Sequence, residues 1–336
     1  MPRRRCTSAE MAPSLLDTFR ILSSFETVRL SLRGAPWDAY VEWAISQGLA
    51  PLAAYNLEYR LGGADAPEWV RDRLLSVYQG SLNDNVMKLV QFKRTIDALE
   101  GCRILLLGGA CFVEALYPHV AFRPLLQIRM LLREVDLDRA TAAFSAGSFK
   151  PAPGASAAQS SSRVLSDGRT ELVLSCSMLG EKRLAAENAI FDRGLPMKVY
   201  GPSIFRPNLE DAILLVCLAH GRSGYQVPML SFVDLRELLL GAPSVSGPYS
   251  HPFDAVALKG RAADWRIERA LFASASIVEK LFPAAAVAVQ QALPPLRATS
   301  RRLLERGIVA PVVDLGKTRA LRGAQRWTRL LVGGLV

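Results

Sequence analysis

Apolar side chains recur at steps of three and four residues between positions 75 and 99, which is the spacing of one face of an α-helix. These apolar positions are Leu75, Tyr78, Leu82, Val86, Leu89, Phe92, Ile96 and Leu99. Just upstream, Asp65 offers a helix cap, Pro67 an early proline and Glu68 a first-turn acid. The pattern therefore predicts a helix that begins there and either runs through Gly80 or breaks near it.

The periodicity changes after this helix. Residues 104–107 form a short, solidly apolar run that ends in Gly108 and Gly109. Such a run predicts a buried strand followed by a tight turn. We expect a helix over residues 110–117 and a second apolar strand over residues 125–132 to follow.

A further helix and strand complete this alternating region. Asp136 offers a cap for a helix that Gly147 would end. Residues 150–163 are rich in Pro, Ala and Ser and are expected to form a flexible loop. A turn over residues 166–168 then leads to a third predicted strand over residues 171–179.

After Pro196 the chain reads as helical again. Asn208 caps a predicted helix, and Asp264 is expected to open another that runs through Leu281. The sequence pattern thus predicts four regions: a helical N-terminal region 1–100, an α/β core 101–200, a helical subdomain 201–316 and a tail 317–336.

The tail has its own pattern. Basic residues occupy one side of a helix that we expect from Lys317 to Val332, and apolar residues, among them Trp327, occupy the other. Such a basic amphipathic helix could lie on an anionic membrane surface or contact a partner protein. It could equally pack on its own domain.

Composition narrows the class of protein. The chain has 336 residues, 50% of them hydrophobic, and a net charge of +10. Its arginines are spread along the chain without a helix-turn-helix, zinc-finger or RNA-binding signature, so a nucleic-acid partner is not expected. No apolar run approaches the roughly 20 residues of a membrane span, and the basic start at Met1 lacks an apolar signal core, so we expect a cytoplasmic protein. The five cysteines show no metal-ligand spacing, and the three histidines form no recognisable catalytic arrangement.

Several motifs follow one another in a recognisable order. They are LLLGGACFVEALY at residues 105–117, RPLLQIRMLL at 123–132, DLDRA at 136–140, LEDAILLVCLAH at 209–220, FVDLREL at 232–238, and Asp264 with Trp265. In order and spacing they resemble the bacterial uncharacterised nucleotidyltransferase family of the polymerase-beta-like superfamily, from about Trp43 to Leu281. The resemblance implies an α+β fold with a small mixed-sheet core and helical N-terminal and C-terminal parts.

The same resemblance implies a metal-dependent reaction, but the expected ligands are replaced. In the family, an Asp-x-Asp pair on one strand and a third acid on a neighbouring strand hold divalent metal. Here Gln127 and Arg129 occupy the paired positions, Gly108 replaces a lysine, and the third acid would fall near Val173, with Glu171 the nearest carboxylate. A guanidinium about 4 Å from a divalent ion would repel it by about 8 kcal/mol at an effective dielectric constant of about 20. No metal site and no cofactor are therefore expected.

These residues define the candidate site and three hypotheses. Gly108, Gly109, Arg123, Gln127 and Arg129 are the candidate ligand-binding residues, and we expect an electropositive cleft around the two arginines.

The first hypothesis is a catalytically degenerate family member that binds a nucleotide or another anionic small molecule. The second is an active enzyme, with Glu171 as its catalytic acid, that uses Mg²⁺ and a nucleoside triphosphate to transfer a nucleoside monophosphate to a hydroxyl of a small molecule, sugar or peptide. The third is an interaction or membrane-surface module that uses the tail helix.

Overall fold

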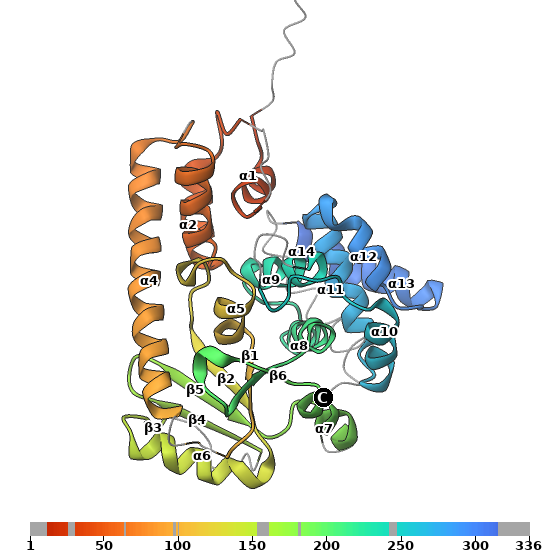
Figure 1. The fold of residues 1–336 in the computed structure, drawn as a ribbon. Coiled ribbons are helices and arrows are strands. Elements are labelled where there is room, and N and C mark those ends of the chain that lie inside the picture. Colours follow the sequence, from red (N-terminus) through yellow and green to blue (C-terminus); the bar gives the residue numbers. More distant parts are fainter. Residues whose placement is uncertain are drawn as a thin grey trace, which may run out of the picture.

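The computed structural model describes residues 12–25, 31–63, 65–96, 99, 101–152, 161–180, 183–241 and 247–314. They form an α+β fold in which one mixed sheet is flanked by helices, as the sequence predicted (Figure 1). The buried apolar residues form one continuous cluster through all of these parts. The predicted tail helix from Lys317 to Val332 lies outside the described residues.

The N-terminal region is helical. Its elements are α1 (Leu15–Leu22), α2 (Trp37–Ser46), α3 (Ala50–Tyr55), the π-helix η1 (Asn56–Arg60) and α4 (Glu68–Ile96). The predicted long helix is confirmed as α4, which passes through Gly80 without a break and runs along one side of the molecule down to the sheet (Figure 1).

The buried face of α4 is partly polar. Ser81 Oγ donates to the carbonyl of Ala121 over 2.9 Å, and Lys88 Nζ donates to the carbonyl of Leu125 over 2.5 Å. Between them, the Asn85 amide donates to two carbonyls of the same loop and accepts from the Leu125 N–H. Meanwhile Val86, which the periodicity placed on the buried face, is exposed. This helix therefore holds the segment before the second strand by hydrogen bonds as well as by apolar packing.

The sheet has seven strands among the described residues, in the order β3-β4-β5-β2-β1-β7-β6. Their bounds are β1 (Ile104–Leu107), β2 (Gln127–Leu131), β3 (Lys150–Pro151), β4 (Ser162–Ser166), β5 (Glu171–Ser175), β6 (Leu195–Pro196) and β7 (Ile204–Arg206). The β1–β7 and β2–β5 pairs are parallel and the others are antiparallel.

The three predicted strands are confirmed as β1, β2 and β5, although β5 ends at Ser175 rather than at residue 179. The prediction of a loop over residues 150–163 is wrong at both ends. Lys150 and Pro151 pair with β4, and β4 itself begins at Ser162 and pairs with β5. Pairing with a neighbouring strand decided these segments, and their Pro- and Ser-rich composition concealed it.

Among the described residues, the core has five helical elements. They are α5 (Gly109–Ala115), the 3₁₀ turn η3 (Val120–Phe122), α6 (Glu134–Ala146), α7 (Leu184–Asp192) and the 3₁₀ turn η5 (Lys198–Tyr200). Of these, α5 and α6 pack against the sheet. Gly147 ends α6 as predicted, but the N-cap is Arg133, so Asp136 lies in the first turn rather than at the cap. A first-turn acid still favours the helix through its dipole.

The C-terminal half is helical and gathers on the side of the molecule opposite α4 (Figure 1). Its elements are α8 (Leu209–Arg222), α9 (Met229–Leu240), α10 (Ala255–Asp264), α11 (Glu268–Leu281), η6 (Pro283–Ala285), α12 (Ala286–Ala292), α13 (Ala298–Leu304), η7 (Glu305–Val309) and α14 (Ala310–Val313). The cap at Asn208 is confirmed, since its Oδ1 accepts from the Asp211 N–H over 3.0 Å.

The prediction that Asp264 opens a helix is wrong. Asp264 ends α10, because Arg266 takes a left-handed φ of 56° and breaks the helical path before Glu268. No helix among the described residues is long and apolar enough to cross a bilayer.

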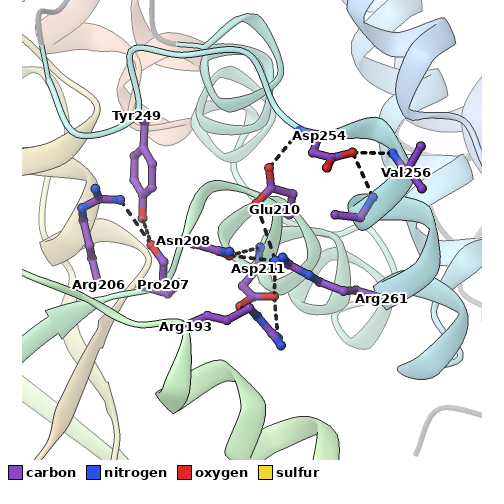
Figure 2. Close-up of polar contacts among 11 residues, drawn as sticks. Arg193, Arg206, Pro207, Asn208, Glu210, Asp211, Tyr249, Asp254, Val256 and Arg261 are labelled. Carbon is purple, nitrogen blue, oxygen red and sulfur yellow. Dashed lines mark hydrogen bonds and ion pairs between the residues drawn. The ribbon is translucent and has the colours of Figure 1, made fainter.

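A buried carboxylate at the start of α8 ties three parts of the fold together (Figure 2). Asp211 accepts from Arg193 Nε over 2.8 Å and Nη2 over 3.0 Å, and from Arg261 Nη1 over 3.1 Å. Arg193 directly follows α7, and Arg261 lies on α10. This network therefore fixes the helical half against the α/β core.

We expect Asp211→Ala to lower the free energy of unfolding by about 2 kcal/mol, because Arg193 loses the carboxylate that it binds while Arg261 keeps Glu210 at 3.5 Å. Chemical denaturation measures this change. Asp192→Ala is the matched control, since the Asp192 side chain is 73% exposed and its nearest cation is 4.0 Å away. Equal effects of the two substitutions would contradict a structural role for the Asp211 network.

His220 is fully buried near the end of α8. Its Nδ1 lies 3.1 Å from Ser274 Oγ and its Nε2 lies 2.8 Å from Ser231 Oγ. Burial lowers the pKa of His220 from 6.5 to about 3. This side chain thus joins α8, α9 and α11 as a neutral ring.

The pKa of His220 predicts acid sensitivity. Between about pH 6.5 and pH 3 the unfolded chain takes up a proton that the folded chain does not, so stability falls as the pH falls through this window. We expect this residue to contribute about 2 kcal/mol of lost stability between pH 7 and pH 5. The measurement is denaturant unfolding at both pH values, with His220→Gln as the control that cannot titrate. The same pH dependence in both proteins would contradict the assignment.

Candidate functional site

A cavity of about 650 Å³ opens where the sheet meets the helical half. Its wall is built from the β1–α5 turn, the start of β2, one side of α4, and the helices α8 and α9. All five candidate ligand-binding residues line it: Gly108, Gly109, Arg123, Gln127 and Arg129. The structure thus brings these residues together, while their binding of a ligand stays a prediction.

The two glycines shape the turn between β1 and α5. Gly108 caps α5 with φ 55° and ψ −129°, a conformation that L side chains rarely adopt. At Gly109 the constraint is space, because an added Cβ would clash with Nη1 of Arg123 and lie 3.2 Å from Cδ2 of Leu125. The absence of a side chain at Gly109 leaves the space that the Arg123 guanidinium occupies.

Arg123 reaches across the cavity wall to a buried acid of α9. Its Nη2 donates to Asp234 Oδ2 over 2.7 Å and its Nε lies 3.0 Å from both carboxylate oxygens. The Tyr117 hydroxyl donates to Asp234 Oδ1 over 2.7 Å. Burial alone would lower the pKa of Arg123, but Asp234 outweighs it and the pKa is raised. Burial and the Asp234 charge together hold the pKa of Tyr117 well above its usual value.

This ion pair corrects the expectation of an electropositive cleft with two arginines. The charge of Arg123 is compensated by Asp234, whose side chain is 1% exposed. Arg129 is the remaining guanidinium of the predicted pair. Partial burial and, secondly, the nearby charge of Arg123 lower the pKa of Arg129. An arginine nevertheless remains protonated at neutral pH.

Gln127 and Arg129 lie on the same face of β2, as the strand alternation predicted, with Ile128 buried on the other. When the Gln127 amide oxygen faces Arg129, it accepts from Nε over 3.0 Å and from Nη2 over 2.7 Å. The described residues place no carboxylate within 4.0 Å of this guanidinium. Arg129 therefore has a neutral partner that orients it and leaves its charge uncompensated.

Glu171, the candidate catalytic acid, lies one strand away from the cavity wall. It is exposed at the start of β5 and pairs in parallel register with Gln127, while Val173 pairs with Arg129. Parallel partners present their side chains on the same face of a sheet, so Glu171 follows Gln127 on that face. It is not among the residues that line the cavity. A catalytic role for Glu171 stays a prediction.

Two acids of the cavity wall were not expected from the sequence. They are Asp84 of α4 and Asp234 of α9. Asp84 is engaged by Lys88 at 2.6 Å and, more distantly, by Arg169 at 3.8 Å. The Phe232-Val-Asp234 motif was visible in the sequence, but nothing local indicates that its acid meets a residue of the core.

The residues present do not fit a divalent metal. Both wall acids already have cationic partners. Arg129 lies on β2 at a position where the sequence resemblance implies a metal ligand. No group of three or more His, Cys, Asp or Glu side chains suited to metal binding occurs in the described part of the chain. Any ion near Arg129 would meet a positive charge in place of the anionic oxygens that magnesium requires.

We expect Gly109→Ala to lower the free energy of unfolding by about 1–3 kcal/mol, because the new Cβ must displace the Arg123 guanidinium from Asp234. Gly80→Ala is the control. Gly80 also lines the cavity, but an added Cβ there meets nothing within 4 Å and α4 gains up to about 1 kcal/mol of helix propensity. Denaturant unfolding of both variants separates the two effects, and a Gly109→Ala protein as stable as the unmodified chain would show that Arg123 is not confined.

Comparison with known proteins agrees with this architecture. No significant match was found among curated proteins or among solved structures. The model of one protein family, described as uncharacterised nucleotidyltransferase, matches residues 33–283, which is about three quarters of the chain and includes the whole sheet and the cavity wall. The chain therefore belongs to the uncharacterised nucleotidyltransferase family.

Proposed function

We propose that this family member binds a nucleotide or another small phosphate-bearing anion in the cavity, without the metal-dependent transfer that the family name describes. The observation that carries the proposal is Arg129, a guanidinium at the cavity wall with a neutral partner. A charge-assisted hydrogen bond from such a group to a phosphate oxygen is stronger than a neutral one.

The surroundings of Arg129 support anion binding in two ways. Gln127 holds the guanidinium in place, so less side-chain freedom is lost when a ligand binds. Arg123 contributes a further positive group nearby, although Asp234 compensates most of its charge. The same arrangement disfavours the family reaction, since transfer from a triphosphate needs metal ions to neutralise the developing charge.

The active-enzyme hypothesis remains the second candidate because of one feature of the sheet. Glu171 and Gln127 are register partners on one face, so an acid does lie beside the position where the family carries its first aspartate. In our proposal this carboxylate takes no part in transfer. Robust magnesium- or manganese-dependent release of pyrophosphate from a nucleoside triphosphate, abolished by Glu171→Ala, would show that the protein is a working enzyme.

We expect ATP and inorganic pyrophosphate to bind in the presence of EDTA, with no requirement for magnesium, in isothermal titration calorimetry. Arg129→Gln should weaken the binding of both anions by about tenfold to a hundredfold. This factor corresponds to the free energy that a hydrogen bond to a charged group contributes. Arg133→Gln serves as the control, because Arg133 lies just beyond the same strand and does not line the cavity.

Three results would contradict the proposal: binding of neither anion, binding that appears only with magnesium, or equal affinity in the Arg129→Gln and unmodified proteins.

A further inference from the structure

One wall of the cavity that Arg129 lines is an apolar stripe of a single helix. Ala212, Leu215, Val216 and Ala219 of α8 recur at steps of three, one and three residues, and all four line the cavity. This spacing places them on one face of the helix. The stripe therefore lines the cavity, although Ala212, Leu215 and Val216 are also largely covered by their neighbours.

Apolar side chains continue around this stripe. Pro228 and Leu230 at the start of α9, together with Met178, also line the cavity. Leu126, next to Gln127 in the sequence, lines it as well and is 75% exposed. A large apolar surface thus adjoins the Gln127–Arg129 pair.

The polar side chains of the wall are already engaged. The three serines bond within the protein: Ser46 Oγ donates to the carbonyl of Trp43, Ser81 Oγ to the carbonyl of Ala121, and Ser231 Oγ lies 2.8 Å from His220 Nε2. Asp84, Arg123 and Asp234 have partners of opposite charge. Among the charged and amide side chains of the wall, Gln127 and Arg129 are thus the two without an ion-pair partner.

We infer that the ligand of this cavity is an amphiphilic phosphate ester, with its phosphate at Arg129 and an apolar chain or ring along the α8 stripe. This inference rests on the proposed function and narrows its ligand class. A polar sugar or base would lie against an apolar wall whose serine hydroxyls already bond within the protein. Burying polar groups without hydrogen-bond partners costs free energy. An apolar body gains free energy in proportion to the surface it buries there.

A series of alkyl phosphates tests the inference. Titration calorimetry with butyl, hexyl and octyl phosphate, each below its micelle concentration and in EDTA, should show tighter binding by about fourfold for each methylene that the wall buries. Ala219→Gln, which places an amide on the stripe, should reduce this gain per methylene. Ala142→Gln is the control, since Ala142 is exposed on α6 and does not line the cavity.

The outcomes distinguish the two proposals. A change of less than about twofold between butyl and octyl phosphate, with Arg129-dependent pyrophosphate binding retained, would overturn the amphiphile inference and leave the proposed function standing. The full gain per methylene with no loss of affinity in Arg129→Gln would overturn the phosphate anchor, and with it the proposed function. A gain that Ala219→Gln leaves unchanged would show that the chain binds elsewhere and would also overturn the inference.

Discussion

The ion pair between Arg123 and Asp234 holds the sheet of this protein against its helical half. The two residues are 111 positions apart, one in the loop before β2 and the other on α9. A buried carboxylate without a partner is costly, so the pair fixes where α9 lies relative to the β1–α5 turn. It also requires Gly109, because the guanidinium occupies the space of a side chain there. The cavity lies between the parts that this pair joins.

The polar face of α4 completes this arrangement from the other side. Asn85 and Lys88 bond to the backbone between Val120 and Leu125, so the chain enters β2 along a defined path. That path sets which face of β2 carries Gln127 and Arg129. The position of the candidate site thus depends on hydrogen bonds from α4, although none of the candidate ligand-binding residues lies on this helix.

The fold of this protein and the side chains of its candidate site point to different chemistry. The sheet and the glycine turn lie within the region that the nucleotidyltransferase family model matches, and β2, where the sequence resemblance implies paired acids, carries an amide and a guanidinium. Function depends on the site and not on the fold, so an inherited scaffold can keep its cavity while its ligand changes. A cation beside an apolar wall favours an anion with an apolar body, and this is the chemistry on which our proposals rest.

The sequence by itself determined the long helix α4, the strands β1, β2 and β5 and the cap at Asn208, because each depends on neighbours a few residues apart. It misplaced the start of α11 and missed β3 and β4, where Arg266 and strand pairing outweighed the local pattern. Only the tertiary structure decided that Arg123 is paired with Asp234 while Arg129 is not, and that an apolar face of α8 borders the same cavity. Charges and surfaces that are far apart in the sequence meet through packing, and no local spacing encodes that meeting.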